Sequence, residues 1–242
     1  MRLIPRRGSH RHPRRAASNT EAPEPIGGQP RPVKPRLRGV SHRWAFFASL
    51  FAGVALVLVA PSKRAVAAAM VYALSLSALF GVSALYHEVT WSVPVRRWMR
   101  RVDHSMIFLL IAGTYTPFGV LVLRGTLALV VLAVVWSGAL LGMTLNMVWI
   151  DAPKWFSAIV YISLGWVAVV AFPELGSQLG ATATGLIVLG GVLYSAGAAV
   201  YALRRPDPAP EVFGYHEVFH ALVIAAAVAH YVVVAFYVVP RS

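Results

Sequence analysis

Two histidines near the C-terminal end of the chain, His216 and His220, are four residues apart. On an α-helix this spacing puts both imidazoles on one face, so that their nitrogens can share a metal ion. His87 adds a third imidazole and Asp103 a carboxylate, both next to or within long apolar stretches. Ionisable side chains in such stretches are costly and usually functional. Three imidazole nitrogens with a vacant fourth position are typical of a catalytic zinc site rather than of a closed structural one.

A hydroxyl and a carboxylate complete the set of candidate residues. Ser83 lies four residues before His87, one helical turn away from that imidazole. We expect Asp103 to hold a metal-bound water and accept its proton, and Ser83 to orient the water or stabilise the oxyanion. Nitrogen ligands favour zinc, although they leave iron and manganese open.

Each of these side chains also has a simpler interpretation. His216 and His220 could be core residues that hydrogen-bond carbonyl groups of neighbouring helices, and His87 could be an interfacial residue at a helix end. Asp103 could cap the N-terminus of its helix, and Ser83 could bond the carbonyl group four residues before it.

The composition indicates a membrane protein. Of the 242 residues, 58% are hydrophobic and only 13% are charged, whereas soluble proteins have about 25% charged residues. The chain has no cysteine, which excludes disulfide frameworks, thiolate nucleophiles and cysteine-ligated zinc or iron–sulfur sites.

Seven apolar segments are each close to the ~20 residues that a helix needs to cross the hydrocarbon core. They are expected at about residues 44–60, 65–87, 103–123, 126–147, 154–172, 181–203 and 215–239. We therefore predict an all-α fold, an integral membrane bundle of seven transmembrane helices in residues 44–242. If the N-terminus is inside, the inner segments between the spans carry seven Lys or Arg and the outer ones four, not counting the tail. The positive-inside rule therefore predicts a cytoplasmic N-terminus and an external C-terminus. In this topology the three histidines and the aspartate lie at one depth, near the inner surface.

Residues 1–43 have a different composition, with 11 Lys or Arg and seven Pro. Such a segment cannot bury enough apolar surface to order itself, and we predict a disordered basic cytoplasmic tail. The net charge of +13 could also suit a nucleic-acid arm. We favour attraction to anionic lipid headgroups of the plasma membrane and expect no nucleic-acid partner.

Three separated motifs resemble the bacterial hemolysin III family, the prokaryotic branch of the progestin and adiponectin receptor family. They are Ser83-Ala-Leu-Tyr-His87, then Asp103-His-Ser-Met-Ile followed by Leu110-Ile-Ala-Gly-Thr-Tyr-Thr-Pro117, and Gly214-Tyr-His216-Glu-Val-Phe-His220. The resemblance implies a seven-helix fold with zinc near the cytoplasmic side, held by His87, His216 and His220, with Ser83 and Asp103 matching the family's helix 2 serine and helix 3 aspartate. It also implies metal-dependent hydrolysis of a lipid, as in the wider superfamily that includes the alkaline ceramidases.

Three functions remain open at this point. The first is hydrolysis of an amide or ester bond of a membrane lipid by zinc-activated water. The second is a membrane sensor or receptor with a structural zinc, and the third a cytolytic membrane protein. A retinal protein is excluded, because none of the three lysines (Lys34, Lys63 and Lys154) lies in the last span to form a Schiff base.

Overall fold

The structure is a computed structural model that describes residues 35–241. It is all-α, and seven of its helical segments are long and apolar enough to cross a membrane. The helices are α1 (Val40–Leu58), α2 (Lys63–Glu88), α3 (Val93–Leu121), α4 (Gly125–Val148), α5 (Lys154–Gly165), α6 (Phe172–Leu179), α7 (Ala181–Leu203) and α8 (Tyr215–Val233). The predicted disorder of residues 1–34 lies outside the described residues.

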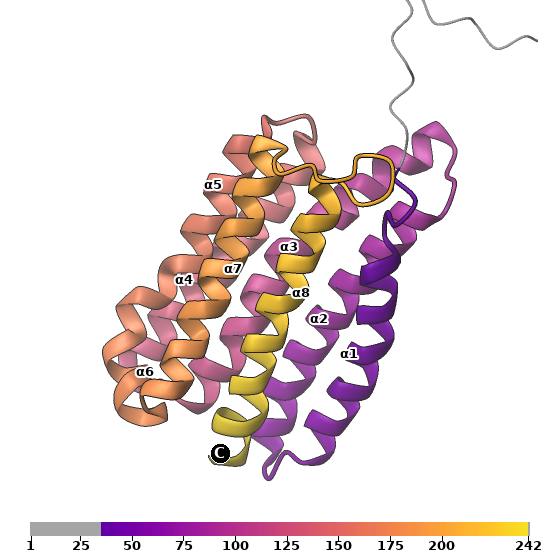
Figure 1. The fold of residues 1–242 in the computed structure, drawn as a ribbon. Coiled ribbons are helices and arrows are strands. Elements are labelled where there is room, and N and C mark those ends of the chain that lie inside the picture. The colour runs from indigo at the N-terminus through magenta and orange to yellow at the C-terminus, as the bar shows by residue number, and fades with distance from the viewer. Residues whose placement is uncertain (1–34, 242) are drawn as a thin grey trace, which may run out of the picture. The chain divides into compact units, whose positions relative to one another are not determined.

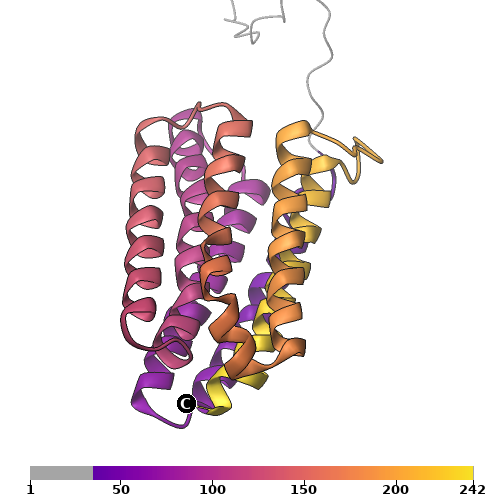
Figure 2. The same cartoon turned by 90° about the vertical axis from the view of Figure 1, so that its left-hand side faces the viewer.

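The long helices run alongside one another as a bundle (Figures 1 and 2). α1 to α4 pack against one another in chain order, α5 packs on α7, and α7 packs on α8. α8 also contacts α1, so the first and last crossings are neighbours. This return of the chain brings the C-terminal histidine pair beside the N-terminal helix.

Close packing of α2 on α3 depends on a glycine. A Cβ atom at Gly113 would lie 2.0 Å from Ser75 Oγ, far inside van der Waals contact. Small residues at helix contacts are typical of membrane bundles, because they let two backbones approach closely. Since α2 carries His87 and α3 carries Asp103, this contact helps to set the distance between the two.

α3 begins ten residues earlier than predicted, at Val93 rather than at Asp103. The arginine-rich segment that the sequence analysis treated as a break is helical, with Pro94 in the first turn, where its fixed φ suits a helix start. Arg100 donates to Asp151 Oδ1 at 3.0 Å and so ties this end of α3 to the α4–α5 loop. The suggestion that Asp103 caps its helix is therefore wrong, because Asp103 lies inside α3.

The fifth crossing is longer than predicted and is interrupted. α5 and α6 are joined by a 3₁₀ segment, Trp166–Ala171, and the crossing as a whole ends at Leu179. The Tyr115 hydroxyl donates to the Gly165 carbonyl and accepts from the Ala168 amide, each at 2.6 Å. The side chain thus satisfies backbone groups at the interruption, as an irregular backbone at membrane depth requires.

α1 begins at Val40, so residues 40–43, which were assigned to the tail, form its first turn. The segment before it lies along the α7–α8 loop. Arg36 N donates to Glu211 O at 3.0 Å and Leu37 N donates to Val212 O at 3.2 Å. These two backbone bonds fix where α1 starts relative to α8.

Candidate metal centre

The three predicted ligands come together. One ring nitrogen each of His87, His216 and His220 lies within 4.8 Å of the others, the one group of this kind found among the described residues. The Nε2 atoms of His87 and His216 are 3.1 Å apart. Zinc–nitrogen bonds of 2.0–2.1 Å in a tetrahedron separate two ligand nitrogens by about 3.3 Å. The spacing of the His87 and His216 nitrogens is therefore close to that of two ligands on one tetrahedral ion, and the group as a whole could hold a metal ion.

The ligands come from two helix ends. His87 lies in the last turn of α2, and His216 and His220 lie in the first two turns of α8. All three are buried, His220 with only 1% of its surface exposed. His220 Nδ1 has no hydrogen-bond partner, and an unmet buried polar atom is costly. A nitrogen-rich group shielded from water in this way is suited to hold a cation.

The segment before α1 closes this end of the site. Arg38 forms an ion pair with Glu217, whose other carboxylate oxygen accepts from the Gly214 amide at 2.9 Å. Gly39 has a φ of +89°, and a Cβ atom there would lie 2.8 Å from His87 Cβ. Glycine is therefore needed for the chain to pass over the end of α2 into α1.

Asp103 lines the same cavity as His216 and His220 but is outside the three-histidine group. Its Oδ2 lies 3.3 Å from His104 Nδ1, and its side chain is 13% exposed. His104 Nε2 in turn is 3.1 Å from the Tyr201 hydroxyl. The carboxylate thus stands beside the imidazole group without taking a ligand position, which suits a proton acceptor.

Ser83 has a partner that the sequence did not reveal. Its hydroxyl lies 2.8 Å from Nδ1 of His42, and both side chains are buried. The His42 ring stacks on the His220 ring with 3.7 Å between centroids and 7° between planes. His42 was missed because it was assigned to the basic tail. Gly39, a residue typical of helix starts, was the local signal that the helix begins before Trp44.

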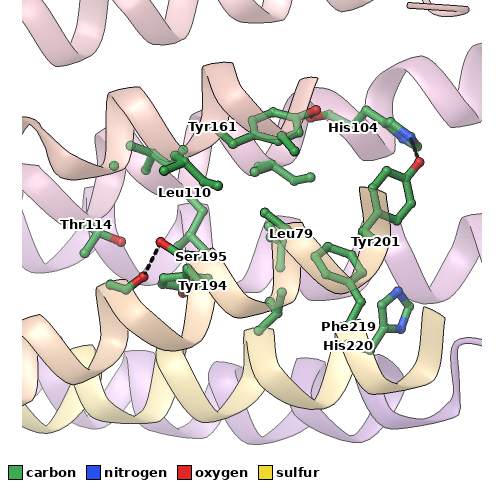
Figure 3. A pocket seen from close by; sticks show the side chains of 18 of the residues that line it. Leu79, His104, Leu110, Thr114, Tyr161, Tyr194, Ser195, Tyr201, Phe219 and His220 are labelled. Atoms are coloured by element: carbon green, nitrogen blue, oxygen red, sulfur yellow. Dashed lines mark hydrogen bonds between the residues drawn. The ribbon is translucent and has the colours of Figure 1, made fainter. Parts of the chain in front are cut away.

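A cavity leads away from these residues into the bundle (Figure 3). His220, Phe219 and Tyr201 lie at one end of the view, and Thr114 and Tyr194 lie at the other. Most of the lining between them is aliphatic or aromatic, contributed by α2, α3, α5, α7 and α8. The shape and chemistry of this space suit an extended apolar chain with its polar end at the histidines.

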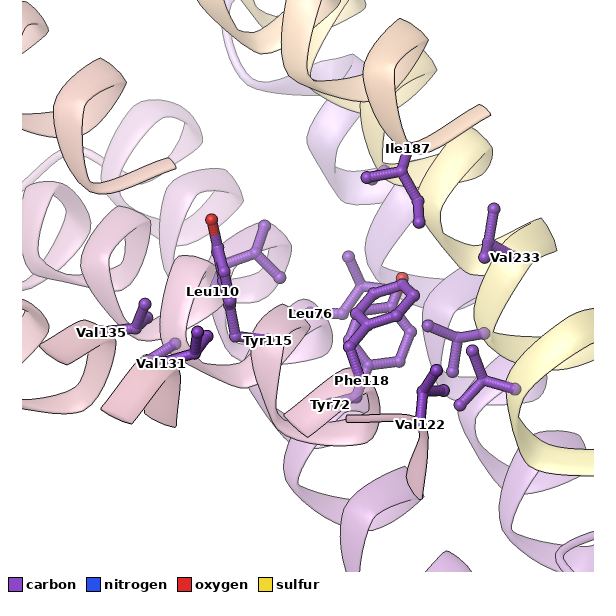
Figure 4. Close-up of a cluster of buried hydrophobic side chains, with 14 of the residues drawn as sticks. Tyr72, Leu76, Leu110, Tyr115, Phe118, Val122, Val131, Val135, Ile187 and Val233 are labelled. Atoms are coloured by element: carbon purple, nitrogen blue, oxygen red, sulfur yellow. The ribbon is translucent and has the colours of Figure 1, made fainter. Parts of the chain in front are cut away.

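Beyond Thr114 the interior holds packed side chains and a second, smaller cavity that Thr114, Tyr115 and Phe118 help to line. The next turns of α3 bring Phe118 and Val122 into a cluster with Tyr72 of α2 and Val233 of α8 (Figure 4). Tyr72 and Val233 are at most 1% exposed.

Comparison with known proteins agrees with this arrangement. Residues 31–231 match the family described as Haemolysin-III related. Hemolysin-3 of Bacillus cereus is 34% identical over 181 residues, which cover 75% of this chain and 80% of that protein. The Hemolysin-3 homolog of Bacillus subtilis (strain 168) is 32% identical over 169 residues, 70% of this chain and 76% of that protein. The adiponectin receptor protein of Drosophila melanogaster is 29% identical over 188 residues, 62% of this chain and 38% of that receptor. The chain is thus a multi-pass membrane protein that belongs to the haemolysin III family, which confirms the resemblance of its three motifs.

Proposed function

We propose that this protein is a membrane-embedded, zinc-dependent hydrolase that cleaves an amide or ester bond of a membrane lipid. The observation that supports this most is that His216 and His220 of the three-imidazole group line an apolar cavity whose wall also carries Asp103. A purely structural metal needs neither a cavity nor a carboxylate beside it. The nitrogen ligands and the near-tetrahedral spacing favour zinc over other divalent ions.

The residues divide the work of such a reaction. His87, His216 and His220 hold the ion. Zinc, when bound, would lower the pKa of the attacking water and polarise the scissile carbonyl. Asp103 accepts the proton of the attacking water and passes it to the leaving group. The cavity walls hold the acyl chain and exclude bulk water, and Ser83 keeps its predicted role of orienting the attacking water or the oxyanion.

The experiment is a hydrolysis assay on the purified protein. Short-chain and long-chain ceramides and ester lipids are supplied in detergent, and released fatty acid is measured beside an Asp103→Ala variant. The proposal expects turnover that this substitution removes. No release above the Asp103→Ala background from any acyl lipid would refute it.

A second candidate is a sensor of lipid state in which the metal clamps α2 to α8. Similarity to an adiponectin receptor protein favours it, as does the position of the ligands on two separate helix ends. It expects a His216→Ala variant to lose thermal stability and signalling while the lipid composition of the membrane stays unchanged. The relatives named hemolysin suggest a third candidate, a cytolytic protein, for which a defined unitary conductance in planar bilayers would be required.

We also propose that the chain lies in the plasma membrane with its N-terminus and metal centre on the cytoplasmic side, and that its basic tail binds anionic headgroups. The positive-inside rule supports this orientation. The natural chain has no cysteine, so single substitutions report on the two sides cleanly. A membrane-impermeant maleimide should label Thr126→Cys on intact cells, and Thr90→Cys only after lysis. The opposite pattern would reverse the orientation.

A further inference from the structure

We propose that His42 is a positioning residue of the metal centre, which orients the His220 imidazole by stacking on it and holds the Ser83 hydroxyl. This inference rests on the proposed metal site. It adds a fourth imidazole to that site, from a helix that carries none of the predicted ligands.

The ring angles separate His42 from the ligands. The His87 and His216 rings are inclined to the His220 ring by 63° and 61°, with centroids 5.2 and 4.6 Å away. Imidazole lone pairs lie in the ring plane, so inclined rings can direct their nitrogens to one ion. His42 lies parallel to His220, at 7° and 3.7 Å. Nitrogens in two parallel, stacked planes do not converge, so His42 supports a ligand rather than being one.

The His42 ring is itself held on three sides. Phe80 meets it edge-on, with 5.1 Å between centroids and 64° between planes. Ser83 Oγ binds its Nδ1 at 2.8 Å, and His220 covers a face. The residue is 2% exposed, and its Nε2 has no hydrogen-bond partner. Burying an imidazole whose Nε2 has no partner is costly, so packing alone does not explain His42. Its ring face stacks on His220 and its Nδ1 contacts Ser83 Oγ.

The position of α1 explains how the contact arises. His42 lies in the first turn of α1, directly after the segment that is bonded to the α7–α8 loop. His220 lies in the second turn of α8, which begins where that loop ends. The stack therefore holds the ligand-bearing face of α8 against α1, and it limits rotation of the His220 ring about its own side chain.

Metal affinity is the direct test. The zinc dissociation constant is measured by chelator competition on the detergent-purified protein and on four variants: His42→Ala, His42→Phe, Ser83→Ala and His230→Ala. Loss of groups that orient a metal-binding histidine typically weakens metal affinity about 10–100-fold, and we expect this for His42→Ala. His42→Phe keeps a ring face on His220 and should recover most of that loss. Ser83→Ala removes the partner of His42 Nδ1 but leaves the ring stack on His220, so it should weaken binding less than His42→Ala.

His230 provides the matched control. It is a partly buried histidine of the same helix α8, its Nε2 lies 3.2 Å from the Ile187 carbonyl, and its Nδ1 is unpaired like His42 Nε2. It lies ten residues beyond His220, about 15 Å along the helix. His230→Ala should therefore leave zinc affinity unchanged, and the melting temperature of each metal-free variant reports general loss of folding.

The outcomes are distinct. Wild-type affinity in His42→Ala, or a His42→Phe variant as weak as His42→Ala, overturns the positioning role while the metal site stands. A wild-type protein that binds no zinc refutes the metal site and the proposed function together. A weakening confined to His42→Ala and Ser83→Ala, with recovery in His42→Phe, supports the role.

Discussion

Removing and restoring the metal should change the stability of the bundle by an amount that can be calculated. A ligand at 100 times its dissociation constant stabilises the folded state by about 2.7 kcal/mol. For a chain of this size, 1 kcal/mol corresponds to about 2–4 °C in melting temperature, so zinc should raise the melting temperature of the stripped protein by roughly 5–11 °C. The 3.1 Å separation of His87 and His216 Nε2 is already close to the tetrahedral value, so little of the binding free energy is lost in rearranging the helices.

The assay follows thermal unfolding in detergent before and after chelation and on return of zinc. His216→Ala leaves two of the three nitrogens, and we expect it to lose the shift at the same zinc concentration. His230→Ala, whose imidazole lies outside the group, should keep it. An equal shift in wild type and His216→Ala would mean that zinc stabilises the protein from another site, and it would refute the assignment of the ligands.

Three further substitutions separate the roles of charged residues near the site. Asp103→Asn should retain zinc, because Asp103 is outside the ligand group, but should lower turnover about 10²–10⁴-fold, since an amide accepts no proton. Loss of zinc from that variant would contradict the assignment. Glu217→Gln leaves Arg38 without its partner in a pair whose side chains are 18% and 2% exposed, and it should cost on the order of 3–5 kcal/mol in unfolding free energy. Glu88→Gln, which breaks the more exposed pair with Arg43, should cost about 1 kcal/mol or less in the same measurement.

The meeting of the three candidate metal ligands could be predicted from sequence because it depends only on local information. Apolar runs define helices that must cross the bilayer, and alternating direction then fixes which helix ends meet. The i, i+4 spacing of His216 and His220 fixes their common face. The alternating direction of the helices and the shared face of His216 and His220 together predict that both lie near His87. The structure confirms this proximity. The i, i+4 relation of Ser83 and His87 predicted proximity correctly, but it could not show that the hydroxyl binds a third residue.

The ends of the helices were predicted less well where charge and helix overlap. A cluster of arginines before Asp103 reads as a polar break on hydropathy alone. In the structure those side chains are accommodated at the end of the bundle, where Arg100 reaches the α4–α5 loop, so the helix continues through them. Hydropathy marks where a segment can enter the membrane, and it does not mark where a helix starts.

His42 was missed for a related reason: it lies in a basic segment, and tertiary contacts rather than the local sequence stabilise the helix there. The residues around it include Arg36, Arg38 and Arg43, and nothing in their periodicity predicts a helix. The first turn of α1 is instead fixed by partners about 175 residues away, through the backbone bonds to the α7–α8 loop and the ion pair of Arg38 with Glu217. A histidine in a basic segment becomes part of a buried imidazole cluster only once the last crossing has docked on the first. The residue that completes the site is therefore the one that depends most on the whole bundle being assembled.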